Sequence, residues 1–241
     1  MRGTALNVVT VLVGSGIGLA VGGRLPERVR ETVLQCLGLF TVVLGIVNAQ
    51  EAFAGPLPDT IGRPAVLVVL GALLVGAILG ELLDLDGRLT RLGEALQRRV
   101  HRDGAEGESS RFVEGFVIAS LVFCVGPLTI LGSIQDGLSG DYQLLAVKSL
   151  LDGFAALAFA SGLGIGVAFS AVPVLVVQGA ISLLAGQAEG VLTEAMISAS
   201  SAAGGVLVLA IGLRLLELRS VRVANLLPAL FIAPAVVAAW P

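Results

Sequence analysis

The chain has 241 residues, of which 56% are hydrophobic and only 14% charged, with a net charge of −3 and a mean hydropathy of +0.95. Soluble proteins carry about 25% charged residues, so these charges are too few to cover a water-exposed surface. The composition therefore indicates an integral membrane protein. It excludes a nucleic-acid-binding protein, which needs a basic face, and a disulfide-stabilised scaffold, which needs more than two cysteines.

Apolar runs of about 20 residues recur along the chain, and each is long enough to cross roughly 30 Å of hydrocarbon. They predict an all-α, polytopic transmembrane helical bundle of eight spans, forming a single transmembrane domain over residues 1–241 with the lipid bilayer as its partner. The glycine-rich stretch 162–166 carries no charge, and we interpret it as a true turn or as the start of a re-entrant segment. The expected spans are 4–23, 33–50, 64–83, 112–134, 143–163, 168–186, 193–213 and 221–239.

The arginines predict the orientation, because cytoplasmic connections are enriched in basic residues. Twelve of the 14 arginines follow the first, third and seventh expected spans. With eight spans, these three connections share one side of the membrane. We therefore expect a multi-pass protein of the bacterial inner membrane with both termini outside.

The basic loop 84–111 has its own pattern. Leu85, Leu89, Leu92 and Leu96 share one helical face, with arginines on the opposite face. This spacing predicts an amphipathic helix lying on the cytoplasmic surface of the membrane. An ordinary loop that only sets the topology accounts for the same residues. His101, the single histidine, has no ligand neighbours, so no metal site is expected.

Two segments resemble each other in sequence. Residues 36–42 (CLGLFTV) match 124–130 (CVGPLTI) in residue type at nearly every position, in the second and fourth expected spans. Together with recurring glycines, this match indicates duplicated helical hairpins. The alternative is that apolar helices resemble one another by composition. We interpret Cys36 and Cys124 as small packing residues inside spans.

Ionisable groups in hydrocarbon are costly, so each one is a candidate functional group. Lys148 and Asp152 are four residues apart in the fifth span and therefore share a helix face. A rise of 1.5 Å per residue from Gln143 places them roughly 8 and 14 Å deep. Lys148 is also the chain's only lysine, and a lysine can release its proton, whereas an arginine effectively cannot. A buried ion pair that only fixes helix packing is the alternative.

Further polar groups are candidates for the same site. Gly126 and Pro127 interrupt the fourth span, and proline frees one backbone carbonyl; broken helices expose such groups to cargo in transporters. Alone, most of the other polar groups would be ordinary interhelical hydrogen bonds, and Asp136 and Glu194 fit the outer interface equally well. The remaining candidates are Asn7, Thr129, Ser133, Asp136, Glu194 and Ser198.

The stretch CVGPLTILGSIQDG over 124–137, followed by KSLLDG over 148–153, resembles the YqgA/YdfK-like bacterial inner-membrane proteins. The resemblance extends to Asn7, to Gly80-Glu81 and to Asn225-Leu-Leu-Pro-Ala229, and so covers nearly the whole chain. The family is catalogued as a domain of unknown function. The resemblance therefore implies a polytopic inner-membrane protein with no established substrate.

Two functions follow as hypotheses. The first is a transporter or channel for a small ion or solute, with its site at Lys148, Asp152 and the Gly126-Pro127 break. The second is a membrane scaffold or regulatory protein whose buried polar residues serve packing only. The sequence carries no metal-ligand cluster, nucleophile motif or phosphate-binding loop, so we expect no enzyme activity and no cofactor. A homo-oligomer is left open.

Overall fold

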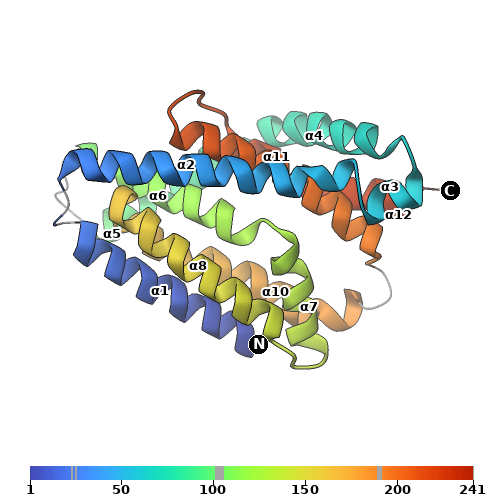
Figure 1. Ribbon diagram of the computed structural model, residues 1–241, viewed down its shortest axis with the longest axis horizontal. Helices are drawn as coiled ribbons and strands as arrows, with labels where there is room; N and C mark the ends of the chain where they lie inside the picture. The colour runs from blue at the N-terminus through green and yellow to red at the C-terminus, as the bar shows by residue number, and fades with distance from the viewer. Residues whose placement is uncertain (23, 25, 101–105, 189–191, 241) are drawn as a thin grey trace. The chain divides into compact units, whose positions relative to one another are not determined.

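The computed structural model describes residues 1–22, 24, 26–100, 106–188 and 192–240, and every regular element in these ranges is a helix (Figure 1). The α-helices are α1 Arg2–Gly22, α2 Glu27–Ala49, α3 Pro56–Ile61, α4 Ala65–Leu82, α5 Leu85–Val100, α6 Glu106–Cys124, α7 Pro127–Leu138, α8 Gln143–Leu163, α9 Gly166–Phe169, α10 Ala171–Ala188, α11 Glu194–Leu215 and α12 Ala229–Ala238. Two 3-10 helices are η1 Gln50–Ala52 and η2 Val223–Leu226.

The predicted class of all-α transmembrane bundle is confirmed, but the count of eight spans is not. Six described segments are long and apolar enough to cross a membrane, and α6 with α7 makes a seventh if this pair, bent by 62°, is one span. The eighth expected segment is shorter, because it divides into η2 and a ten-residue α12 with Pro228 between them. Eight spans therefore stay a prediction.

The uncharged glycine stretch is a helix break. Helix α8 ends at Leu163, and Gly164 follows with φ of +84°, a conformation that favours glycine. The next candidate span, 166–185, is 20 residues long, which is enough for a full crossing.

Large apolar side chains cover much of the surface. Leu82 on α4, Phe154 on α8 and Phe231 on α12 are each more than 70% exposed, and many valines, leucines and isoleucines accompany them. Soluble monomers rarely expose contiguous apolar patches of this extent. Lipid chains are the natural neighbours of such a surface.

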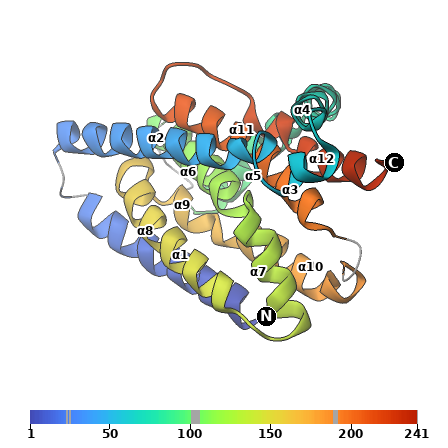
Figure 2. The ribbon, with the colours of Figure 1, turned by 45° about the vertical axis from the view of Figure 1, so that its right-hand side comes forward.

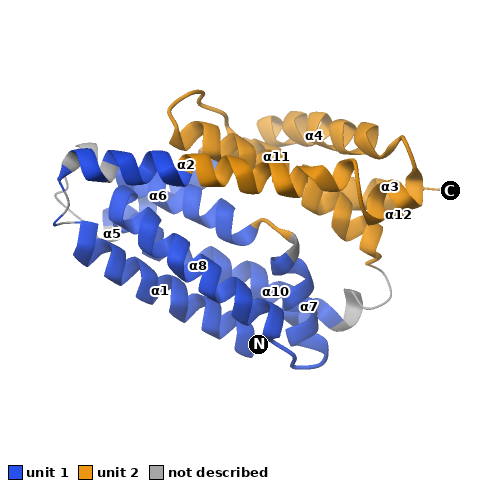
Figure 3. Cartoon of the chain, in the orientation of Figure 1, with its two compact units in different colours: residues 1–37, 88–124, 128–186 blue, residues 38–87, 125–127, 187–241 orange. Residues whose placement is uncertain are grey.

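The chain divides into two compact units (Figure 3). Unit 1 comprises residues 1–37, 88–124 and 128–186, and unit 2 comprises 38–87, 125–127 and 187–241. The single domain over residues 1–241 therefore stays a prediction.

In unit 1, α1 and α8 lie side by side and run in the same direction (Figures 1 and 2). Glycines on one face of α1 bring the two backbones together: a Cβ at Gly14 would collide with the carbonyl of Gly153, and one at Gly18 with the carbonyl of Leu157. Small residues allow this approach where lipid supplies no hydrophobic driving force between helices. We call this contact the α1–α8 seam.

Helix α6 packs against α8 in the opposite direction, with Gly115 facing Leu163 at one end and Phe123 facing Lys148 at the other. The rings of Phe123 and Phe159 lie 6.2 Å apart in a tilted arrangement, which is favourable for aromatic pairs. This packing fixes the end of α6 against the middle of α8.

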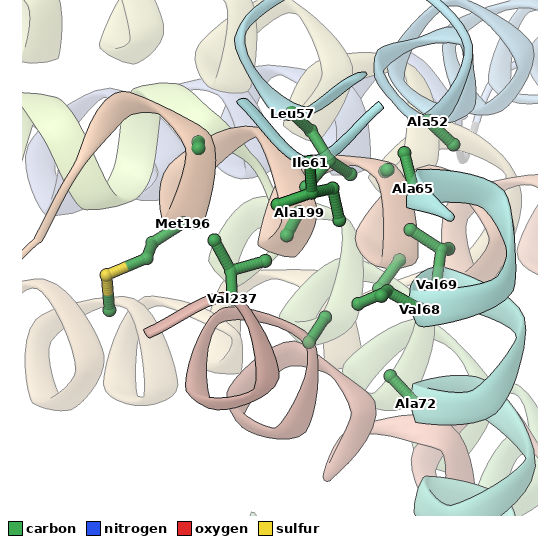
Figure 4. Close-up of a cluster of buried hydrophobic side chains, with 14 of the residues drawn as sticks. Ala52, Leu57, Ile61, Ala65, Val68, Val69, Ala72, Met196, Ala199 and Val237 are labelled. Carbon is green, nitrogen blue, oxygen red and sulfur yellow. The ribbon is translucent and has the colours of Figure 1, made fainter. Parts of the chain in front are cut away.

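Unit 2 is built around α11, of whose 22 residues 16 are buried. Leu57 and Ile61 of α3, Val68 and Val69 of α4 and Val237 of α12 surround its small side chains (Figure 4). Because the first half of α11 consists mostly of alanine, serine and glycine, its neighbours approach it closely there. Helix α4, in contrast, buries only one face.

Two sequence interpretations are modified by the structure. Cys36 is exposed, so its interpretation as a packing residue is wrong, whereas Cys124 is half-buried, which is compatible with packing. Helix α5 covers most of the predicted amphipathic segment; Gly93 and Gln97 are buried on it and Leu92 is half exposed. Its place on a membrane surface stays a prediction, and residues 101–105, with His101, lie outside the described residues. The predicted hairpin repeat is likewise not confirmed.

The topology can be tested by labelling. Parallel α1 and α8 begin on the same side of the membrane, as the orientation derived from the arginines requires. In intact cells, an impermeant thiol reagent should label Ser139→Cys, which precedes α8, and should not label Ser109→Cys. The opposite pattern would invert the topology and contradict the arginine argument.

A candidate ion site at a broken helix

The centre of unit 1 holds an ion pair. Lys148 and Asp152 lie one turn apart on α8, and the Lys148 ammonium contacts the Oδ2 atom of Asp152. Both residues are buried, with exposed fractions of 5% and 8%. Asn7 of α1 donates from Nδ2 to the same carboxylate oxygen, at 2.9 Å. Two helices thus supply donors to one buried carboxylate.

The broken helix supplies the second acceptor for Lys148. Helix α6 ends at Cys124, and Gly126, with φ of +142°, leads into α7, which begins at Pro127. In a continuous helix the Phe123 carbonyl would accept from the backbone N–H of residue 127, but proline has none. The Lys148 ammonium donates to this carbonyl at 2.7 Å, and the Thr129 hydroxyl donates to it at 3.3 Å.

The site therefore surrounds one ammonium with oxygen atoms of different kinds. The carboxylate of Asp152 balances its charge, and the carbonyl of Phe123 satisfies a further N–H. Removing either partner alone would leave an uncompensated buried group, which is costly in low dielectric. Carboxylate and carbonyl oxygens are also the groups that bind small hard cations.

A second carboxylate lies at the start of α1. Asp136, near the end of α7, accepts from the Arg2 and Gly3 amides at 3.2 and 3.0 Å, and its Oδ1 lies 2.9 Å from the Met1 ammonium. Asp136 itself is only 3% exposed. A carboxylate at this position satisfies unpaired N–H groups and interacts favourably with the helix dipole.

Four predicted site residues belong to unit 2. Gly126 and Pro127 form the break next to Phe123, whereas Ser198 and Glu194 lie outside the set that unit 1 brings together. Ser198 of α11 donates to Oε2 of Glu51, at 2.7 Å. Glu194 is exposed in the first turn of α11. Of the other candidates, Lys148, Asp152, Asn7 and Thr129 converge through the contacts above, whereas Ser133 and Asp136 follow Thr129 along α7.

Another polar cluster in unit 2 joins α4 to η2. Glu81 contacts the Arg222 guanidinium and accepts from Nδ2 of Asn225 at 2.6 Å, while Oδ1 of Asn225 accepts from the Asp86 amide at 2.8 Å. A Cβ at Gly80 would collide with the carbonyl of Asn225. This cluster connects the end of α4 and the first turn of α5 to η2.

Sequence reasoning predicted a carbonyl freed by Pro127 but did not name its residue, Phe123, which lies four residues earlier. It missed two further participants, Glu51 and Met1. The pairing of Glu51 with Ser198, and of Met1 with Asp136, had no sequence signal, since each joins residues more than 130 positions apart.

The lipid-facing surface, the long apolar helices and the buried charges define a polytopic helical membrane protein. The comparisons agree with this class. The chain matches the family described as "Protein of unknown function (DUF554)" over residues 2–238, and it belongs to that family. No solved structure matches it.

Two relatives match over nearly their full lengths. The "Uncharacterized membrane protein YdfK" of Bacillus subtilis (strain 168) is 32% identical over 237 residues, covering 98% of this chain and 96% of the relative. The "Uncharacterized protein YqgA" of Escherichia coli (strain K12) is 31% identical over 238 residues, covering 99% and 97%. The resemblance noted in the sequence is thereby confirmed.

Proposed function

We propose that this chain is a transporter or channel for a small ion or solute in the bacterial inner membrane, and that its cargo is a small cation, the proton included. One observation carries the proposal: the Asp152 carboxylate and the freed Phe123 carbonyl converge on a buried ammonium. Ion and proton pathways are the usual place for such pairs within membranes. The proposal includes no enzyme activity, cofactor or resident metal.

In this proposal the Lys148 ammonium occupies the position that a cation would take. Asp152 and the carbonyl at the broken helix supply oxygen atoms around that position, and the Asn7 amide donates to the same carboxylate. A lysine can leave it by releasing its proton or by swinging its flexible side chain away. Binding of the cation would then depend on displacement of the Lys148 ammonium from Asp152.

The test compares Lys148→Arg and Asp152→Asn with the parent in liposomes. A pH-sensitive dye inside the vesicles reports proton movement while Na⁺ or K⁺ gradients are imposed in turn. Arginine keeps the charge but cannot release its proton, and Asp152→Asn removes the carboxylate. We expect each to lower flux by roughly 100-fold, the lower end of what a positioned proton-transfer group contributes to a rate.

Asp141→Asn is the matched control, because it removes a carboxylate of the same charge from the exposed loop before α8. It should keep the parental flux. Parental flux in Lys148→Arg and Asp152→Asn would contradict the proposed site. Absence of flux in the parent under both gradients would favour the scaffold hypothesis.

A further inference from the structure

Two helices of unit 1 run between the same two polar points. On α1, Asn7 contacts Asp152, and Gly3, one turn earlier, contacts Asp136. On α7, Thr129 shares the Phe123 carbonyl with Lys148, and Asp136 lies two turns later. The separation along either helix is about 6 to 10 Å at 1.5 Å per residue. Asp136 and the Lys148–Asp152 pair therefore mark the two ends of one short interval.

Hydroxyl groups lie within this interval on both helices. Thr4 lies between Gly3 and Asn7 on α1, and Ser133 lies between Thr129 and Asp136 on α7. They are 1% and 0% exposed, and neither hydroxyl has a hydrogen-bond partner within the described protein.

Helix α10 brings a buried amide near the Asp136 end of this interval. A Cβ at Gly137, one turn after Ser133, would contact Ala185 at 2.6 Å, and a Cβ at Gly179 would lie 3.6 Å from Met1. Gln178 lies two turns before Ala185 on that face of α10. It is 0% exposed, and neither its Nε2 nor its Oε1 has a hydrogen-bond partner in the described protein.

The unpartnered atoms gather in this part of unit 1. Nine buried side-chain polar atoms of the described residues make no hydrogen bond with the protein, and six of them belong to this interval and the adjoining turn of α10. They come from Thr4, Asn7, Ser133, Gln178 and Ser182. Buried polar groups are normally paired, and small polar interior sites are satisfied by water.

We propose that Thr4, Ser133 and Gln178 line a hydrated route that gives water and protons access from the Met1–Asp136 end of unit 1 to the Lys148–Asp152 pair. Met1 is 48% exposed, so this end lies at the surface of unit 1. Hydroxyl and amide groups both donate and accept, so they can continue a chain of waters. The role of this route rests on the proposed function, but the hydration of the route can be measured independently of flux.

The test is the reactivity of cysteines toward 2-aminoethyl methanethiosulfonate, in a chain carrying Cys36→Ala and Cys124→Ala. Ser170→Cys is the matched control, because Ser170 is also 0% exposed but its hydroxyl donates to the Val167 carbonyl at 2.6 Å. We expect Ser133→Cys to react roughly tenfold faster than Ser170→Cys or more, since a hydrated site opens to water more readily than a packed one.

Thr4→Cys carries the same expectation, so a folding defect at one position does not decide the result. Adding Gln178→Leu should slow labelling of Ser133→Cys roughly tenfold, because an apolar side chain removes partners for water. Equal rates at positions 133, 4 and 170 would overturn the route whatever the flux measurements give. Fast labelling at 133 and 4 in a protein without flux would keep the route and reject the transport proposal.

Discussion

Lys148→Met should destabilise the protein by about 3–5 kcal/mol, the cost of leaving one charge of a buried pair without its partner. The substitution leaves the Asp152 carboxylate with Asn7 and the Phe123 carbonyl with only the 3.3 Å contact from Thr129. Asp152→Asn should also be destabilising, because it leaves the buried Lys148 ammonium without its counter-charge, with the Phe123 carbonyl as its remaining acceptor. Unfolding of the purified variants in detergent measures both effects.

The double variant, Lys148→Met with Asp152→Asn, should be far more stable than Lys148→Met alone. No unpaired charge remains in it, so its main loss is the hydrogen bond to Phe123, worth about 1 kcal/mol. The double-mutant cycle then isolates the coupling between the two side chains. If the losses of stability in the two single variants simply add in the double variant, the two side chains are not coupled, which would contradict the ion pair.

Flux of the same double variant separates a working pair from a structural one. If the pair serves packing only, the double variant should be stable and should keep its flux. If the proposed function holds, it should be stable and inactive, because the exchangeable charges are gone. A stable double variant with parental flux would remove Lys148 and Asp152 from the site.

Local chemistry made part of this structure predictable. The spacing of Lys148 and Asp152 places them on one helix face, and Pro127 dictates that a helix ends before it and frees a carbonyl. Such features depend on a few neighbouring residues and on backbone geometry. The break after Leu163 was likewise indicated by glycines.

The partners of these groups were not predictable. Asn7 contacts Asp152, 145 positions away in the sequence. Asn48 and Asn225 also lie in expected spans, and no local sequence feature distinguishes Asn7 from them. Asp136 was assigned to either the cargo site or the outer interface, yet it is buried against the start of α1. Apolar periodicity reports which residues can share a helix face, whereas the choice of neighbouring helix depends on packing along the whole face. Which polar residues contact one another across helices can therefore be read only from the folded structure.

The α1–α8 seam yields the second large effect. Gly14→Ala should destabilise the protein by about 1–3 kcal/mol or more, the cost of overpacking a close contact, because the added methyl group would collide with the Gly153 carbonyl. Gly18→Ala should behave alike against Leu157. Gly16 on the same helix is the matched control.

Gly16→Ala adds the same methyl group where no atom lies within 4 Å, so the seam stays intact and helix propensity improves stability by up to about 1 kcal/mol. A destabilisation by Gly16→Ala equal to that by Gly14→Ala would show that α1 is sensitive to any change rather than to contact with α8. The seam also positions Asn7 beside Asp152, so Gly14→Ala should lower flux as α1 moves away from α8. If Asn7 has no part in the site, Gly14→Ala should leave the flux per folded molecule unchanged. The flux per folded molecule therefore decides whether the α1–α8 seam sets the geometry of the ion site or only the stability of the protein.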